Sequence, residues 1–276
     1  MPVAKGEPAD SAAGSRSVLR ALEILDLLAA TERPLGLAQI AKEFGIPKSS
    51  CLALLRALAA RDFIRQDETG AYALGLRSFE VGTAYLRAVT PVGAVTPELR
   101  ALTERLGMTA HFAVLEGDEV VYLAKQDPPG TGVRLASSLG ARLSAWTTAV
   151  GKAQLTWADP PPEPAGPAAA EFPAIRQRGY AVDEGVTAGG IQCVAAPVFS
   201  AGGCCGAIGV SYLLHGGPDV PVIAGLLVGA ASRVSAQLGG AWPGPEAPDQ
   251  PASQLTSQPA RQPSSQPSSQ PTERPS

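Results

Sequence analysis

The residues best placed for chemistry in the N-terminal part of the chain follow Pro47. Lys48, Ser49 and Ser50 come next, and proline favours the first turn of a helix because its missing N–H would have no partner there. Free backbone amides at such a helix start attract phosphate, and a lysine adds positive charge. This segment therefore predicts a contact with nucleic-acid phosphates. The alternative is that these side chains only cap and solvate a helix start.

Charge is unevenly distributed along the chain. The net charge is −3, yet residues 15–77 carry more basic than acidic side chains. A local basic face, rather than the net charge, decides whether a protein can bind DNA. The candidate DNA-contacting residues are Gln39, Lys48, Ser49, Ser50, Arg56 and Arg65.

The sequence gives little support for a metal site, a redox centre or a catalytic site. The chain has four cysteines and two histidines, and no CxxC pair that would predict a zinc site or a disulfide framework. We expect no metal and no cofactor, and free thiols without an export signal predict a cytoplasmic protein. Cys193 as the nucleophile of an enzyme remains an alternative, but only the distant His111 and His215 could act as its base. Lys152 lacks the spacing of a phosphate-binding loop.

The helices and strands that must position the basic residues follow one another in an order that is typical of a known DNA-binding motif. A helix capped by Ser15 or Ser17 is expected first, and a short helix over 37–44 ends at Gly45. A third helix runs from Pro47 to about residue 60. Two short strands, 63–65 and 71–74, enclose a turn that contains Gly70. Three helices followed by a hairpin predict a winged helix-turn-helix domain over residues 15–77.

The rest of the chain predicts a second domain of mixed α+β structure. A linker helix is expected over 78–90 and a mainly antiparallel sheet flanked by helices over 91–241. Residues 1–14 are interpreted as a flexible leader and the Ser/Gln/Pro-rich residues 242–276 as a disordered tail. No apolar run is long enough to predict a membrane span. The expected helices are 99–106, 149–157, 174–178 and 220–238, and the expected strands are 111–115, 120–125, 133–135, 191–199 and 207–213.

Several segments, in this order, resemble the IclR-type transcription regulators. They are SRSVLRALEILDLL from Ser15, LAQIAKEFGIPKSS from Leu37, GAYALG at Gly70, TAVGKA at Thr148, RGYAVD from Arg178 and IQCVAAPVF at Ile191. The resemblance implies a GAF-like second domain that binds a small effector, and a homodimer or homotetramer that binds double-stranded operator DNA as a repressor or activator. An exposed contact between subunits is expected on the linker helix, at Phe79, Val81, Leu86 and Val89.

The resemblance also implies an effector site in the second domain. Its lining residues are Ala149, Val150, Asp183, Ile191, Cys193, Gly209 and Ser211. Amides at the helix start could hold a carboxylate, while Asp183 and Ser211 could fix hydroxyl or amine groups. We therefore expect a small organic acid or an aromatic metabolite as effector.

Three segments depart from the family pattern. Leu52-Ala53 replaces a His-Arg that often follows the serine pair, so an arginine able to read guanine is missing. Gly209 replaces a frequent serine, which removes one hydrogen bond from the pocket, and Gly185-Val186 interrupts the acidic pair that usually follows Asp183. These two changes leave open a larger or less polar ligand, or no ligand at all. The first departure leaves an alternative function open, that of a winged-helix protein that binds another protein and has lost its DNA readout.

Overall fold

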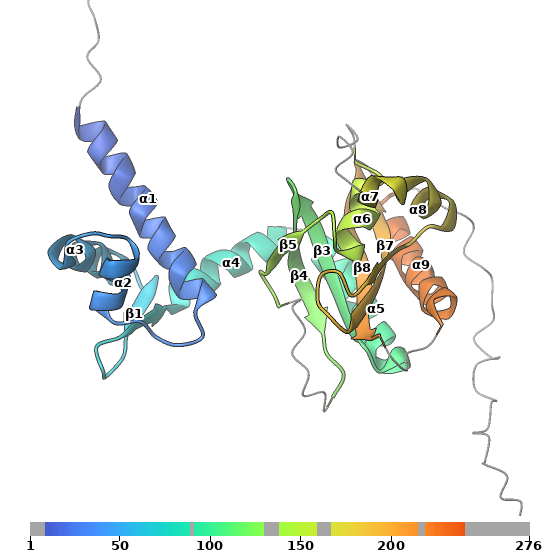
Figure 1. The fold of residues 1–276 in the computed structure, drawn as a ribbon, viewed down its shortest axis with the longest axis horizontal. Helices are drawn as coiled ribbons and strands as arrows, with labels where there is room; N and C mark the ends of the chain where they lie inside the picture. The colour runs from blue at the N-terminus through green and yellow to red at the C-terminus, as the bar shows by residue number, and fades with distance from the viewer. Residues whose placement is uncertain (1–8, 89–90, 130–137, 159–166, 215–218, 241–276) are drawn as a thin grey trace, which may run out of the picture.

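The computed structural model describes residues 9–88, 91–129, 138–158, 167–214 and 219–240. Figure 1 shows a small N-terminal unit and a larger C-terminal unit, with helix α4 (Leu76–Ala88) between them. The strand expected over 133–135, the tail and most of the leader lie outside the described residues.

The N-terminal unit is a winged helix-turn-helix, as the sequence predicted. It contains α1 (Ala9–Ala30), α2 (Leu37–Glu43), α3 (Lys48–Ala59), β1 (Ile64–Gln66) and β2 (Tyr72–Leu74). The two strands pair antiparallel and form the wing. Ile24, Ile40 and Leu55, one from each helix, are fully buried and form its core together with Ile64. These contacts fix α3 on the unit and leave its other side exposed.

The turn between α2 and α3 depends on a left-handed residue. Gly45 has a φ of +62°, a conformation that costs glycine little because it has no Cβ. The next amide, of Ile46, donates to the carbonyl of Ala41 over 3.1 Å. Pro47 is the N-cap of α3, one position before the first turn in which the sequence analysis placed it. Lys48, Ser49 and Ser50 then form an exposed first turn.

Two helix starts differ from prediction. Helix α1 begins at Ala9 and runs through Ser15 and Ser17, so neither serine caps it, and part of the expected leader is helical. Helix α5 (Pro91–Leu106) begins well before residue 99 and contains Pro97 in its interior. A proline inside a helix removes one helical hydrogen bond. Tertiary packing offsets that cost, since Val95 and Leu99 on either side of it are buried in the core.

A six-stranded antiparallel sheet organises the C-terminal unit, which confirms the predicted α+β class. Its spatial order is β5-β4-β3-β8-β7-β6. The sequence analysis missed β5 and β6 because each is very short, and it began β8 too late. The bounds are β3 Thr109–Glu116, β4 Glu119–Gln126, β5 Arg142–Ser144, β6 Ala181–Glu184, β7 Ile191–Ser200 and β8 Gly203–Leu213.

Helices cover both faces of this sheet (Figure 1). Alternate residues of each strand point to opposite faces, and they separate into two cores. Val194, Ile208 and Val210 face α5 and α9 (Val220–Gln237), whereas Ala195 and Ala207 face α6 (Ala149–Leu155). The short helices α7 (Pro167–Ala170) and α8 (Phe172–Arg178) precede β6, and α8 ends at the left-handed Gly179.

Helix α9 is long and apolar enough to cross a membrane by length and composition alone. It is nevertheless a core helix, because Ile223, Leu227 and Val234 are fully buried against the sheet. No other helix in the described parts of the chain passes the same test.

The junction between the wing and α4 generates a stability prediction. A Cβ on Gly75 would lie 2.2 Å from the carbonyl oxygen of Asp62, and that backbone cannot swing away as a side chain would. We expect Gly75→Ala to lower the free energy of unfolding by about 1–3 kcal/mol through overpacking. Gly82→Ala is the matched control, because nothing lies within 4 Å of a Cβ at that exposed α4 position, and it should be neutral or stabilising by up to about 1 kcal/mol. Urea unfolding measures both, and equal effects would contradict the prediction.

Candidate functional site

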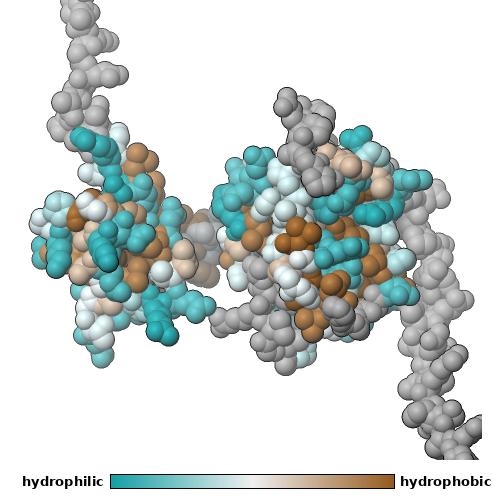
Figure 2. Space-filling model, viewed as in Figure 1, coloured by the Kyte–Doolittle hydropathy of each residue, from teal (hydrophilic) through white to brown (hydrophobic). Residues whose placement is uncertain are grey.

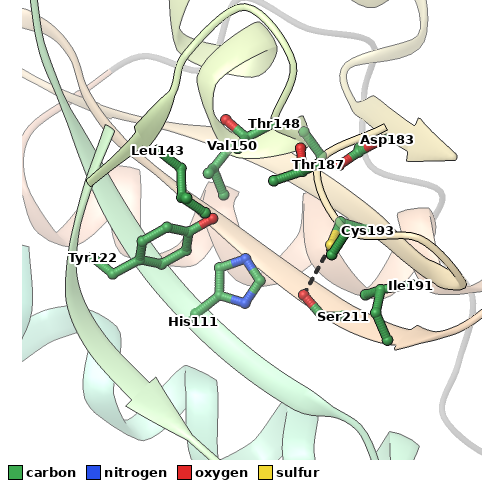
Figure 3. Close-up of a pocket in the computed structure, with 12 residues that line it drawn as sticks. His111, Tyr122, Leu143, Thr148, Val150, Asp183, Thr187, Ile191, Cys193 and Ser211 are labelled. Carbon is green, nitrogen blue, oxygen red and sulfur yellow. Dashed lines mark hydrogen bonds between the residues drawn. The ribbon is translucent and has the colours of Figure 1, made fainter. Parts of the chain in front are cut away.

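A cavity lies between α6 and the sheet in the C-terminal unit (Figure 3). It encloses about 400 Å³ of space free of atoms when its open mouth is included. Only about 30 Å³ admits the centre of a water molecule, so the side chains stand close together. Its lining comprises His111, Tyr122, Leu143, Thr148, Ala149, Val150, Asp183, Thr187, Ala188, Ile191, Cys193 and Ser211.

Strand register brings three polar side chains to the cavity from three neighbouring strands. Asp183 of β6 is opposite Cys193 of β7, and Cys193 is opposite Ser211 of β8. Directly paired residues point to the same face of a sheet, so the three form one row on the α6 side. Within it the Cys193 Sγ and Ser211 Oγ atoms are hydrogen-bonded at 2.9 Å. The Asp183 carboxyl group accepts the amide of Val186 at 2.8 Å and is 2% exposed.

The neighbouring row carries a histidine over small residues. His111 of β3 is opposite Gly209 of β8, which is opposite Ala195 of β7. The imidazole is 1% exposed. It packs edge to face against the Tyr122 ring, with 5.2 Å between the two ring centroids. Its Nδ1 atom has no hydrogen-bond partner among the described residues. An unpaired buried nitrogen is costly, so it is a natural partner for a bound molecule.

Burial controls the protonation of these groups. It lowers the pKa of His111 to about 3, with a further lowering by the nearby charge of Lys125 and an opposing effect of Asp127. Burial also raises the pKa of the Cys193 thiol to about 11, and raises that of Tyr122. At neutral pH the cavity therefore contains a neutral imidazole, a thiol and a phenol. These groups donate and accept hydrogen bonds without carrying charge.

Helix α6 is held firmly at the edge of the cavity. Thr148 caps it by accepting the amide of Gly151 at 3.1 Å. A Cβ on Gly151 would lie 2.2 Å from the carbonyl oxygen of Ala145, so only glycine permits this close approach of the backbone. Lys152 on the same helix is 6% exposed and binds the Glu171 carboxylate at 2.9 Å. Lys152 thus anchors α6 to the segment between α7 and α8, which accounts for it without a phosphate site.

The structure brings together almost all of the residues that the sequence analysis placed in this site. Ala149, Val150, Asp183, Ile191, Cys193 and Ser211 line the cavity, whereas Gly209 lies beneath His111 and is not part of the lining. Sequence reasoning missed His111 and Tyr122, because a histidine or tyrosine in a strand is more often structural. The opposition of His111 to a glycine would have been the only usable signal, and it requires the strand register.

The predicted DNA-contacting residues lie on the other unit. Lys48, Ser49, Ser50 and Arg56 are exposed on α3, and Arg65 is exposed on the wing strand β1. The exposed Gln39 of α2 uses its Oε1 atom to accept the Gly36 amide at 2.8 Å. That contact caps α2, and the side-chain NH₂ of Gln39 is left to donate elsewhere.

Metal and disulfide chemistry have no site in the described parts of the chain. No three His, Cys, Asp or Glu side chains there are grouped as metal ligands would be. All four cysteines are free thiols.

Comparison with known proteins decides the family. Residues 17–68 match the family model described as the IclR helix-turn-helix domain. Residues 83–163 and 168–215 match the one described as the bacterial transcriptional regulator IclR C-terminal domain. The chain belongs to the IclR family of transcription regulators. It is therefore a DNA-binding transcription regulator and not an enzyme, which removes the alternative of Cys193 as a nucleophile.

Individual relatives agree with this assignment. The HTH-type transcriptional regulator BhcR of Paracoccus denitrificans is 33% identical over 219 residues, which cover 72% of this chain and 78% of that protein. An IclR-family regulator structure from Alicyclobacillus acidocaldarius is 28% identical with a TM-score of 0.69, covering 81% of this chain and 99% of that one. An IclR homologue of Microbacterium hydrocarbonoxydans, solved in complex with 4-hydroxybenzoate, shares the fold with a TM-score of 0.71 at 18% identity. That match covers 80% of this chain and 98% of that one.

Proposed function

We propose that a small molecule bound in the cavity beneath α6 modulates the affinity of this IclR-family regulator for its operator. The observation that carries the proposal is the concentration of buried polar groups around one cavity. Asp183, Ser211 and the unpartnered Nδ1 of His111 all lie there at less than 5% exposure. A few convergent polar groups in an otherwise apolar pocket are typical of small-molecule sites.

The lining supports an effector that is small, partly apolar and hydroxylated or acidic. Leu143, Val150 and Ile191 offer apolar contacts, and the Asp183 carboxyl group, which accepts the Val186 amide, has a second oxygen that can accept a hydrogen bond from a ligand. The amides at the start of α6, at Ala149 and Val150, are the place for an acidic group. Because the closed cavity admits little more than water, such a ligand must part these side chains when it enters. The complex of the Microbacterium homologue with 4-hydroxybenzoate supports an aromatic acid as a first compound to test.

The effector site generates a prediction with a matched pair of variants. Ser211→Leu fills the cavity and should abolish stabilisation by the effector, while DNA binding by the effector-free protein stays nearly unchanged. Ser211→Ala keeps the room and loses only the contact with Cys193, so it should retain a weakened response. A ligand that binds only the folded form at a hundredfold excess over Kd adds about 2.7 kcal/mol to the free energy of unfolding. Thermal unfolding with a metabolite panel reads this out, and a full response in Ser211→Leu would place the effector elsewhere.

We further propose that the first turn of α3 binds the phosphate backbone and that Arg56 and Arg65 extend this contact. Helix amides, two serine hydroxyls and the Lys48 ammonium group are exposed together at one helix start, which suits phosphate. Ser49 and Ser50 are exposed beside Lys48 and reach base edges or phosphates, while Gln39 donates from α2.

Since the regulator must meet DNA, and its four cysteines are free, the cytoplasm is the compartment that we propose for it.

The DNA contact leads to a second prediction. Lys48→Ala should weaken binding to all duplex sequences alike and lower the slope of log K against log salt by about one, as expected for one lost phosphate contact. Arg142→Ala, which removes the same charge from an exposed side chain of the C-terminal unit, is the control and should leave both quantities unchanged. Fluorescence anisotropy over a salt series measures them. An unaltered slope in Lys48→Ala would mean that the lysine is only a solvated helix residue.

A homodimer is the assembly that we propose. Helix α4 exposes apolar side chains on two of its sides, Leu76 and Phe79 on one and Val81 and Tyr85 on the other, each at 48–69% exposure. On the face shown in Figure 2, brown apolar residues interrupt the polar surface of both units. Of the other expected contacts, Leu86 instead packs against the C-terminal core and Val89 lies outside the described residues. Two copies also allow two recognition helices to reach successive half-sites of an operator.

The assembly gives a third prediction. Phe79→Glu should shift the protein toward the monomer at micromolar concentration, because a charge would be buried in the contact. Sedimentation velocity measures the mass, with Arg77→Ala on the same helix as the control for surface changes. A wild-type protein that is a monomer at that concentration would refute the proposed dimer.

A second candidate function is binding of a partner protein through the winged helix. The observation in its favour is Ala53, which leaves the exposed side of α3 without an arginine at that position. Selection of bound fragments from genomic DNA separates the two functions, since only a DNA-reading protein enriches a shared sequence.

A further inference from the structure

Gly209 is a glycine for reasons of space rather than backbone conformation. Its φ lies outside the left-handed region, but a Cβ there would lie 2.7 Å from His111 Nε2 and 3.0 Å from Val150 Cγ1. The first distance is shorter than real Cβ contacts, so a side chain at 209 and the present position of the imidazole exclude each other. The imidazole occupies the place that a residue 209 side chain would take.

The whole row beneath the imidazole is made of small residues. Ala181, Ala195 and Gly209 are cross-strand partners in turn on β6, β7 and β8, and they share the face covered by α6. His111 reaches over this row from β3, the next strand. Figure 3 shows its ring among Tyr122, Val150, Cys193 and Ser211, in the middle of the cavity lining. The histidine is therefore a central wall of the site.

The polar neighbours of His111 favour an uncharged partner. The imidazole is neutral at physiological pH, so one ring nitrogen donates and the other accepts a hydrogen bond. No lysine or arginine is among the described residues that line the cavity, and Asp183 contributes a carboxyl group. Lys125 of β4 lies near enough to act on the imidazole, but it is held by Asp127 at 3.2 Å. A ligand carboxylate beside His111 would add a second negative charge near Asp183 and would find no cation to pair with. A ligand hydroxyl group, in contrast, can both donate and accept a hydrogen bond there.

We infer that His111, held in the cavity by the absence of a side chain at Gly209, selects effectors that carry a hydroxyl group. This inference rests on the proposed effector site. His111 touches the ligand directly, and Gly209 is a positioning residue that acts only through His111. The hydroxyl sits against the imidazole, while an acidic group, where the effector has one, lies at the start of α6.

Matched pairs of compounds that differ by one hydroxyl group test this inference. We would measure binding to the full-length protein by calorimetry and thermal shift for 4-hydroxybenzoate against benzoate and for lactate against propionate. The hydroxylated member of at least one pair should bind about tenfold more tightly, because its absence leaves buried polar atoms unpaired. His111→Leu should bring this ratio close to one. His111→Gln, which keeps a neutral donor and acceptor, should retain most of it.

The role of Gly209 is tested separately. Gly209→Ala should displace the imidazole and reduce the hydroxyl preference as His111→Leu does. Gly93→Ala on α5, where nothing lies within 4 Å of the added Cβ, should leave it unchanged. Nitrogen-15 NMR of the two histidines, assigned with His111→Gln, reports on the ring directly. Its signals should move in Gly209→Ala without ligand, and in the wild type only with the hydroxylated compound.

The possible outcomes separate this inference from the function on which it rests. If these compounds bind but the hydroxyl makes no difference, or His111→Leu keeps the preference, the inference is overturned and the effector site stands. Unmoved His111 signals on binding would overturn it in the same way. If none of these four compounds stabilises the wild type, hydroxyl selection fails, and the proposal of an organic-acid effector fails with it.

Discussion

The antiparallel register of β6, β7, β8 and β3 is the constraint on which the C-terminal unit depends. Because side chains alternate between the two faces, the same strands build a dry core against α5 and α9 and a polar cavity against α6. A slip of one residue in β6 would bury Asp183 in the apolar core, and a slip of one residue in β7 would turn Val194 toward the cavity. The long apolar helix α9 stabilises this register, since it packs across β7 on the side away from the cavity. Stability and recognition therefore reside on opposite faces of one sheet.

The N-terminal unit follows a different principle. Its core is small and its recognition surface is polar, so the exposed first turn of α3 needs only a firm base beneath it. Ile40, Leu55 and Ile64 provide that base, and the left-handed Gly45 sets the angle at which α3 leaves α2. The exposed apolar residues of α4 lie between the two units, where the proposed dimer contact would act on both.

Sequence patterns predicted most of the fold. Helical periodicity and turn residues located α2, α3, the wing and the long strands, since those signals are local. The start of α1 was misplaced because a serine suggests a helix cap, whereas α1 runs through both serines. The start of α5 was placed at Leu99, whereas the helix extends back through Pro97 to Pro91. The short β5 and β6 were missed because three or four residues show no reliable alternation, whereas the equally short wing strands were recognised from the turn between them. The pocket residues came from family resemblance, and His111 escaped because its significance depends on a residue nearly a hundred positions away in the sequence.

The mutual exclusion of the imidazole and a residue 209 side chain also restricts how this pocket can change during evolution. In a chain with His111, a serine at 209 would place its Cβ 2.7 Å from the present position of the imidazole, so the ring would have to move out of its place in the cavity. The two positions are therefore coupled, because a side chain at 209 displaces the imidazole and loss of the imidazole makes room for a side chain at 209. Relatives with a side chain at position 209 should therefore either lack the histidine or hold its ring in another orientation.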